Sequence, residues 1–395
     1  MNILVYCFAF SPSIGGIEIV TETLSRKLTE LGNNCIVLTE TQSDKKDDFP
    51  FRVVRKPNSK EILKLMKWSD VVCNVELSMK FFLLSKIARR PLFWIHNGYK
   101  LSCIDAFGWF ENAPAPINPW QSVKFYARKK NITFALKEGF KLYCRRWASA
   151  HIAGNIAGSQ WIAKRQPLKR QAQIYTPFPV DNFIAIENEL NKKYDFVFLG
   201  RLVKEKGVET LLNAIKILVK KPNNKSIKLA IIGYGAAENY LKEVAGKLEV
   251  EDNVHFLGPR RNEELTDIVS KCEIAVIPSH WEEPMGGAAL QLMAAGRIMI
   301  VSNNGGLKEV VGKAGLTFEN GNAEDLALKM DQLISNEELK VSLLGYRKEQ
   351  LKKFEPVKLT KEFAELFSMS LGKKKPVVYK SNTTDIALSH LSSSK

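Results

Sequence analysis

Two positively charged side chains, Arg201 and Lys206, lie in a short loop that follows a predicted buried strand at 195–199. The loop reads Gly-Arg-Leu-Val-Lys-Glu-Lys-Gly from position 200 and leads into a predicted helix. Cations at such a strand-to-helix junction, beside a helix N-terminus, suit a diphosphate. A lone basic loop is more often only part of a solvated surface. Its place after the first strand of the second half makes diphosphate binding and a solvated surface equally good interpretations.

A second loop of the same kind, at 280–287, combines a carboxylate with glycines. Glu283 can accept hydrogen bonds from sugar hydroxyls. The backbone N–H groups of Gly286, Gly287 and Ala288 stand where a helix begins and can meet a phosphate. An ordinary helix N-cap with an acidic first turn is the alternative. It does not explain why a tryptophan and two glutamates precede the glycines.

The first half of the chain alternates apolar strands with helices. Strand 2–10 is followed by a Gly-containing turn, an amphipathic helix at 17–31 and a buried strand at 35–39. This βαβ order is typical of a parallel sheet. Further short strands are predicted at 71–75, 92–95 and 151–157. The opening apolar run lacks the basic start and the cleavage site of a signal peptide, so we interpret it as a buried strand.

The second half repeats this alternation with clearer boundaries, which predicts a doubly wound α/β domain whose ligands bind at the carboxyl ends of the strands. The predicted strands are 195–199, 228–232, 254–257, 273–277, 298–301 and 315–318, and the predicted helices are 207–220, 238–248, 262–271, 287–295, 307–311 and 323–335.

A chain of 395 residues exceeds what one hydrophobic core usually organises. We therefore expect an α/β protein with two Rossmann-like domains that face each other across a cleft. The N-terminal domain is assigned to 1–185 and the C-terminal domain to 192–345. The linker candidates are the proline-containing stretch 175–180 and the polar run 187–193. A helical segment at 346–370 is expected to pack back toward the first domain, and 371–395 to form a disordered tail.

The net charge of +16 is concentrated in 51–180, which holds 23 Lys and Arg against 6 Asp and Glu. A solvated basic surface is one interpretation, and an anionic partner such as a bilayer surface or a lipid-linked phosphate is the other. Within this region, 108–116 is expected to be irregular because it is rich in proline. The basic and aromatic stretch 122–146 reads as a packed helix pair, or else as an acceptor lid or membrane-surface element.

Several classes of protein are disfavoured. Nucleic-acid binding lacks a zinc spacing, an RNP-like motif or a recognition-helix pattern. The six cysteines show no CxxC spacing, which predicts reduced, buried thiols and a cytoplasmic protein, with peripheral attachment to the inner face of the membrane left open. No run reaches the roughly 18–20 apolar residues of a membrane span. A dehydrogenase would need a G-x-G-x-x-G after the first strand, and Gly15-Gly16 lacks the third glycine.

Over roughly residues 1–370 the sequence resembles the GT-B glycosyltransferases of the large retaining family 4. The loop from Gly200-Arg201 to Lys206-Gly207 is similar to the donor loop of that family. The run 283–296 resembles its Glu-x7-Glu motif, 304–311 its Gly-Gly-x-x-Glu segment, and 174–183 its interdomain stretch ending in Val-Asp-x-x-Phe. Four motifs in order at sensible spacing make the resemblance specific.

The resemblance implies that a sugar moves from a nucleotide-sugar donor to a saccharide or lipid-linked acceptor with retention of configuration. Arg201 and Lys206 would neutralise the donor diphosphate as charge builds on the leaving nucleotide, and Glu283 would hold hydroxyls of the donor sugar. The family's front-face route needs no carboxylate nucleophile. The sequence has no Asp-x-Asp motif, in keeping with a fold that needs no bound metal or other cofactor.

In the first domain, the resemblance equates Gly15 and Gly16 with the family's donor-binding glycine loop, whose close backbone approach shapes the cleft beside the phosphate and the acceptor. It equates His96 with the histidine that lies near the donor sugar. Judged without the family, a single histidine at a strand end is more often structural. The base of the nucleotide is expected on the loops at 233–235 and 258–261, largely through backbone groups.

One position departs from the family motif. The second Glu of Glu-x7-Glu, which binds the ribose diol in the family, is Gln291 here. A carboxylate accepts two hydrogen bonds from vicinal hydroxyls, whereas an amide offers one acceptor and one donor group. The open alternatives are an active enzyme with adapted ribose contacts, a weak enzyme, or an inactive homologue that serves as a sugar- or nucleotide-binding module.

Overall fold

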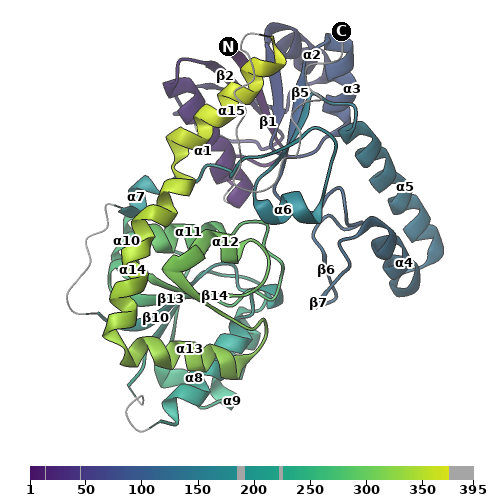
Figure 1. Cartoon of the computed structure of the whole chain (residues 1–395). Helices are drawn as coiled ribbons and strands as arrows, with labels where there is room; N and C mark the ends of the chain where they lie inside the picture. The colour runs from purple at the N-terminus through teal and green to yellow at the C-terminus, as the bar shows by residue number, and fades with distance from the viewer. Residues whose placement is uncertain (14, 45, 185–191, 222–225, 373–395) are drawn as a thin grey trace. The chain divides into compact units, whose positions relative to one another are not determined.

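The computed structural model of the chain describes residues 1–13, 15–44, 46–184, 192–221 and 226–372. It divides into two compact units, shown in Figure 1. Unit 1 comprises Met1–Gly108, Ala115–Phe178 and the segment from Phe354 onward, and unit 2 comprises Trp109–Pro114 and Pro179–Lys353. The boundary between Phe178 and Pro179 falls within the linker candidate 175–180. Most of the other candidate, 187–193, and nearly all of the predicted tail lie outside the described residues.

Unit 1 is built on a seven-stranded parallel sheet in the order β3-β2-β1-β4-β5-β8-β9. Residues 3–7 of β1 are all buried because helices cover both faces of the sheet, which explains their continuous apolar run. The strands are β1 (Asn2–Cys7), β2 (Asn34–Thr39), β3 (Arg52–Arg55), β4 (Val71–Asn74), β5 (Leu92–His96), β8 (Gly154–Ala157) and β9 (Gln171–Gln173).

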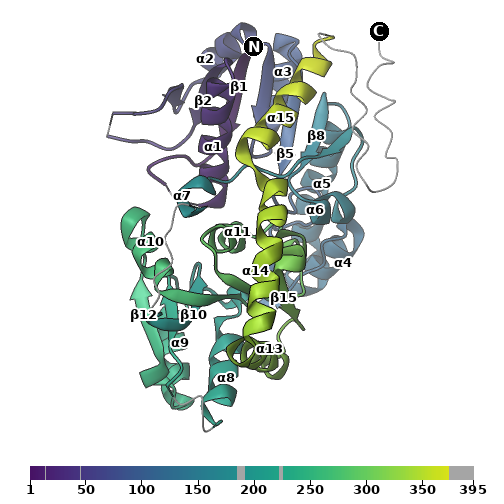
Figure 2. The ribbon, with the colours of Figure 1, turned by 60° about the vertical axis from the view of Figure 1, so that its left-hand side comes forward.

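Short polar side chains start most of the helices of unit 1. Asn58, Ser78, Asn118, Asn131 and Ser159 each accept a hydrogen bond from a backbone N–H of the first turn. The helices are α1 (Gly16–Glu30), α2 (Ser59–Trp68), α3 (Met79–Ala88), α4 (Pro119–Lys129), α5 (Ile132–Ser149), α6 (Gln160–Arg165) and α15 (Pro356–Ser370). The last of these, α15, packs against α1, as Figure 2 shows.

Unit 2 contains a six-stranded parallel sheet in the order β12-β11-β10-β13-β14-β15. Numbered along the chain this is 3-2-1-4-5-6, the order of dinucleotide-binding folds, and its direction reverses between β10 and β13. The strands are β10 (Tyr194–Leu199), β11 (Leu229–Ile232), β12 (Val254–Gly258), β13 (Cys272–Ile277), β14 (Ile298–Ser302) and β15 (Gly315–Phe318).

The helices of unit 2 cover this sheet and enclose a core formed by the strands with α8, α9 and α13. They are α7 (Asp181–Ile184), α8 (Val208–Val219), α9 (Glu238–Lys247), α10 (Asn262–Ser270), α11 (Gly287–Ala294), α12 (Leu307–Val311), α13 (Ala323–Ser335) and α14 (Glu337–Leu351). Residues 346–370 were predicted to pack toward the first domain. Their first part, 346–351, belongs to α14 of unit 2, and their last part forms α15 of unit 1. None of the helices in the described ranges is both long and apolar enough to cross a bilayer.

The stretch 108–116 is not irregular as expected. It contains a small antiparallel hairpin of β6 (Trp109–Phe110) and β7 (Ala113–Pro114). Glu111 and Asn112 both have positive φ, at 47° and 62°, which is the backbone of a type I′ turn. The prediction was wrong because proline is tolerated at the last position of a short edge strand.

Candidate functional site

The candidate site of unit 2 lies where β10 and β13 end. These strands are parallel neighbours, pairing Phe196 with Ile274 and Val197 with Ala275. Their carboxyl ends therefore meet at the same edge of the sheet, where the strand order reverses. In doubly wound sheets this is the place at which a crevice opens and ligands bind. The two loops singled out from the sequence both start at this edge.

Backbone hydrogen bonds join the two loops. Glu205 O accepts bonds from His280 N at 3.0 Å and from Trp281 N at 3.2 Å. Gly207, which has φ of 67°, packs so closely that an added Cβ would lie 2.0 Å from Pro278 O. The glycine after Lys206 is therefore required by the contact between the loops as well as by its backbone angle.

Lys206 and Glu283 form an ion pair within this edge. Lys206 Nζ lies 2.8 Å from Glu283 Oε1, and the side chains are only 15% and 10% exposed. Buried Ser279 donates its hydroxyl to the same carboxylate oxygen. The Lys206 ammonium also lies 5.5 Å from the ring centre of Trp281, within the range of a cation–π contact.

Arg201 has a different environment. Its side chain is 63% exposed, and its nearest carboxylate contact is Glu205 Oε1 at 3.9 Å. An exposed pair at that distance is weak. The guanidinium can therefore leave Glu205 for an incoming anion at little cost, whereas the Lys206 ammonium is held in place.

The helix that follows Glu283 begins without a side-chain cap. Gly286, the N-cap of α11, has φ of 105°, and an added Cβ would lie 2.5 Å from Leu307 Cδ2. Gly287 and Ala288 form the first turn, where backbone N–H groups lack intrahelical acceptors. Gln291, one turn later in the same helix, is half-buried.

The loop of β14 completes this edge. Gly306 N donates to Glu283 O at 2.7 Å, and Asn304 Nδ2 donates to His280 O at 2.8 Å. Gly305 has φ of 64°, and a Cβ there would lie 2.5 Å from Glu283 N. The Gly-Gly segment of the sequence thus supports the backbone that carries Glu283.

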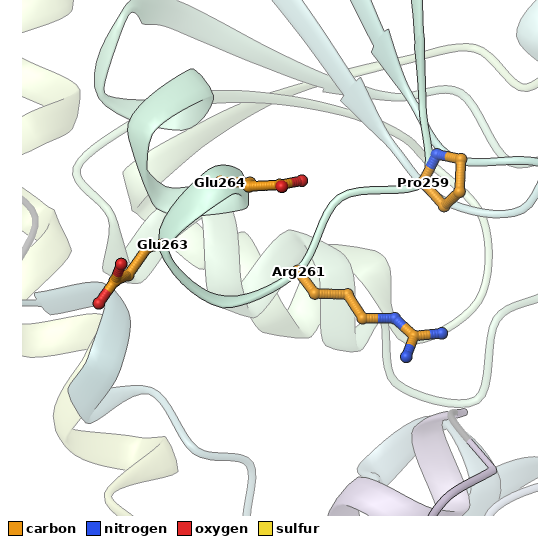
Figure 3. Close-up of a pocket in the computed structure, with 4 residues that line it drawn as sticks. All are labelled: Pro259, Arg261, Glu263 and Glu264. Carbon is orange, nitrogen blue, oxygen red and sulfur yellow. The ribbon is translucent and has the colours of Figure 1, made fainter.

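The loops expected to hold a base lie side by side on the other half of the sheet. Gly233 N donates to Gly258 O at 3.0 Å, and Leu202 N donates to Tyr234 O at 2.9 Å. A hollow of about 620 Å³ next to them is lined by Pro259, Arg261, Glu263 and Glu264. Figure 3 shows Arg261 and Glu264 extending to the side of Pro259, with Glu263 turned the opposite way. Lys206 and Glu283 do not line this hollow.

His96 ends β5 in unit 1 and is buried. Its Nε2 lies 2.9 Å from Asn155 Oδ1. The amide nitrogen of Asn155 donates to Ser149 O and Lys169 O, so its oxygen is the acceptor and His96 carries its proton on Nε2. Burial lowers the pKa of His96 to about 4, and the bond to Asn155 opposes this only in part. His96 is therefore neutral at physiological pH.

Gly15 and Gly16 lie at the start of α1 in unit 1. Gly15 is extended, with φ of −166°. An added Cβ would lie 2.6 Å from Glu18 Oε2, the far end of a flexible side chain. At Gly16 the nearest atom to an added Cβ belongs to Phe178, at 3.9 Å. Within unit 1, neither glycine is required by a backbone contact.

The structure thus groups the predicted residues by unit. Arg201, Lys206, Glu283, the start of α11 and Gln291 belong to one sheet edge of unit 2, and Gly15, Gly16 and His96 belong to unit 1. Sequence reasoning missed Ser279, Trp281 and Asn155 as partners of the candidate residues. Asn155 could have been noticed, because a polar residue in an apolar strand usually satisfies another buried polar group.

The comparisons with known proteins agree with this picture of unit 2. Residues 180–350 match the family profile described as "Glycosyl transferases group 1". An uncharacterized glycosyltransferase of Methanocaldococcus jannaschii is 34% identical over 142 residues, which are 35% of each chain. D-inositol 3-phosphate glycosyltransferase of Corynebacterium urealyticum is 28% identical over 177 residues, 43% of this chain and 42% of that protein. The similarity spans less than half the length of these relatives.

Solved structures are similar over nearly the whole chain. HepE of Anabaena, in complex with UDP, has a TM-score of 0.70 at 17% identity, covering 93% of this chain and 100% of that one. Sucrose-phosphate synthase of Thermosynechococcus elongatus has a TM-score of 0.70 at 15% identity, covering 94% and 100%. At such low identity the likeness establishes the fold. Residues 180–350 thus match the glycosyl transferases group 1 family, and the described part of the chain has the GT-B fold, with two Rossmann-like units.

Proposed function

We propose that the chain is a glycosyltransferase of retaining family 4, and that it transfers a sugar from a nucleotide-sugar donor bound by unit 2. The observation that carries this proposal is the Lys206–Glu283 pair at the carboxyl ends of β10 and β13. A sugar nucleotide has an anionic diphosphate and an uncharged sugar. The cation and the uncapped helix N-terminus suit the diphosphate, and the carboxylate suits the sugar hydroxyls.

The diphosphate is the anionic part. Lys206, exposed Arg201 and the first N–H groups of α11 are three sources of positive charge near one sheet edge. As the bond between the sugar and the diphosphate breaks, negative charge grows on the leaving phosphate, and groups already in place stabilise that charge most effectively. These groups supply the neutralisation for which other enzymes use a divalent cation, so we propose transfer without a bound metal or another cofactor.

The sugar is the polar, uncharged part. Ser279 and Lys206 both donate to Oε1 of Glu283, which fixes the carboxylate. Its Oε2 is then the oxygen to which hydroxyls of the donor sugar donate.

Retention follows if the acceptor attacks from the face that the diphosphate leaves. The bond between the anomeric carbon and the phosphate oxygen breaks, and the bond to the acceptor oxygen forms. The acceptor proton passes to the departing phosphate oxygen, so no protein carboxylate acts as nucleophile. Neutral His96, whose Nε2–H donates to Asn155, is proposed to contact the donor sugar through the remainder of its ring without exchanging a proton.

We propose a saccharide or lipid-linked acceptor that is recognised by the basic unit 1, in a protein that works in the cytoplasm at the inner face of the membrane. HepE was crystallised with UDP and glucose, which favours a uridine nucleotide as the first donor to test. We propose that the nucleotide base binds at the loops 233–235 and 258–261 and in the adjoining hollow.

A second candidate function rests on Gln291. A carboxylate can accept hydrogen bonds from both hydroxyls of the ribose diol, whereas an amide has only one acceptor oxygen. Gln291 is therefore expected to bind the diol more weakly than a glutamate would. The chain would then be a weak enzyme, or a module that binds sugar nucleotides without transferring the sugar.

A panel of UDP-, GDP- and ADP-sugars separates these functions. We expect one donor class to raise the melting temperature and to release free nucleotide on incubation with the protein. Stabilisation without nucleotide release, with water or with added saccharide acceptors, would favour the binding module. If no sugar nucleotide shifted the melting temperature, the proposed function would be wrong.

A further inference from the structure

The outer face of α5 in unit 1 carries a continuous apolar stripe. It consists of Ile132, Leu136, Phe140, Tyr143 and Trp147, each between 58% and 71% exposed. Their spacing of 4, 4, 3 and 4 residues places all five within an arc of about 80° at 3.6 residues per turn. The outer face of a helix in a globular protein is normally polar. This stripe is therefore an unusual feature that needs a partner.

The stripe is not the packing face of the helix. Ala135, Gly139 and Leu142 are buried on a different side of α5, and a Cβ on Gly139 would lie 3.0 Å from Val123 of α4. The α4–α5 core is thus complete without the stripe. Trp147 also contacts the rings of Phe82 and His151 within unit 1, but all five side chains of the stripe keep more than half of their surface exposed.

Helix α3 extends the apolar surface. Leu83 and Ile87, one turn apart, are also exposed. The helices meet where the ring centre of Phe82 lies 5.8 Å from that of Trp147, and Lys86 donates to His151 O just beyond α5. Figure 1 shows α3 and α5 in succession along one side of unit 1.

The charges around this surface have one dominant sign. Helices α3, α4 and α5 together contain nine Lys and Arg and a single acidic residue, Glu138, which pairs with Lys141 at 2.6 Å. Lys137 and Lys141 follow Leu136 and Phe140 directly and are exposed. On α4, Lys124, Arg128 and Lys129 line a hollow of about 360 Å³.

We propose that this face, formed by the α5 stripe with Leu83 and Ile87 of α3, docks unit 1 on an anionic bilayer surface. Large apolar side chains can enter the acyl boundary, the rings of Tyr143 and Trp147 suit the headgroup level, and the lysines reach lipid phosphates. The cations add electrostatic attraction to anionic lipids. Self-association through the same face would bring two cation-rich helix groups together, which like-charge repulsion opposes.

This inference rests on unit 1 alone and does not depend on the proposed sugar transfer. Vesicle flotation of the full-length protein tests it. We compare phosphatidylcholine vesicles containing about 30% phosphatidylglycerol with pure phosphatidylcholine, each at low and high salt. We expect the protein to float with the anionic vesicles at low salt, and high salt to reduce the bound fraction because it screens the cations.

The double variant Leu136→Glu/Phe140→Glu should lower the bound fraction at least tenfold. Its matched control is Val341→Glu, because Val341 is 62% exposed on α14 of unit 2. The control should bind as the wild type does. The single variant Phe140→Ser, which adds no charge, gives a second reading should the double variant be unstable.

Two results would overturn the proposal. One is wild-type protein that ignores anionic vesicles at low salt. The other is a Leu136→Glu/Phe140→Glu or Phe140→Ser protein that is folded by circular dichroism and binds as the wild type does. A wild-type dimer in analytical ultracentrifugation that the stripe variants dissociate, without vesicle binding, would assign the face to a second copy of the chain instead.

Discussion

Lys206 and Glu283 come from loops 77 residues apart and meet because two neighbouring strands end at the same sheet edge. The sequence predicted Lys206 as a phosphate ligand and Glu283 as a sugar ligand. It did not predict that the two side chains pair with each other. The ion pair of 2.8 Å indicates that each side chain also helps to hold the other in position.

His96 offers a test at the residue scale that is independent of any substrate. Its pKa is lowered to about 4 in the fold from 6.5, because burial disfavours the charged ring. Only the unfolded chain takes up this proton between about pH 6.5 and 4, so the contribution to stability is full above pH 6.5 and falls as the pH drops. We expect wild type to lose about 2 kcal/mol more unfolding free energy than His96→Gln between pH 7.5 and 5.

Guanidinium unfolding of both proteins at the two pH values measures this difference. Groups other than His96 are common to both chains and cancel in the comparison. Equal pH dependence in the two proteins would mean that His96 is not held neutral, and the proposal that it contacts the sugar without proton exchange would lose its basis.

At the scale of elements, glycines of the strand-end loops fix the site. Gly305 and Gly321 both have positive φ, at 64° and 80°, but only Gly305 crowds a neighbour, since an added Cβ would lie 2.5 Å from Glu283 N. Gly321 has no atom within 4 Å of that position. We expect Gly321→Ala to cost about 1 kcal/mol from backbone strain alone. Gly305→Ala should cost more and should also displace Glu283.

Thermal unfolding and donor turnover of both variants measure the two effects. Gly321→Ala should keep wild-type turnover, and Gly305→Ala should lose most of it. If both alanine variants were equally stable and equally active, the loop of β14 would not support Glu283.

Much of the arrangement of elements could be predicted from the sequence, because buried parallel strands read as short apolar runs between amphipathic helices. All six strands of unit 2 lie within two residues of their predicted ends. In unit 1, β3 and β9 were missed, since edge strands such as Arg52–Arg55 keep polar residues. The strand predicted at 2–10 ends at Cys7, and Phe8 is exposed beyond it.

Contacts between distant segments could not be predicted. The bond between His96 and Asn155 and the short approach of Gly207 to Pro278 depend on which strands become neighbours. The exposure of the α5 stripe depends on which side of that helix packs on α4. Periodicity reveals that a helix has an apolar face, and the structure is needed to tell whether that face is covered.

At the scale of the whole molecule, chemistry and charge are divided between the two units. Unit 2 carries the cation–carboxylate edge, and unit 1 contains nearly all of the region 51–180 with its 23 cations.

The six cysteines are all free, and burial raises the pKa of Cys7, Cys103 and Cys272 to about 12, so these thiols stay protonated and unreactive. Five of the six cysteines are buried as predicted, whereas Cys144 is only half-buried.

The central claim is that the edge formed by β10 and β13 performs sugar transfer, and one matched pair of variants tests it directly. Lys204 and Lys206 belong to the same short turn, but the Lys204 ammonium lies over the ring of Tyr240, whereas Lys206 pairs with Glu283. The measurement is the rate of nucleotide release from the sugar nucleotide that stabilises the wild type. We predict a loss of about 10²–10³-fold for Lys206→Ala, as for removal of a preorganised charge-stabilising group, and a near-normal rate for Lys204→Ala. Near-normal rates in both variants would contradict the account.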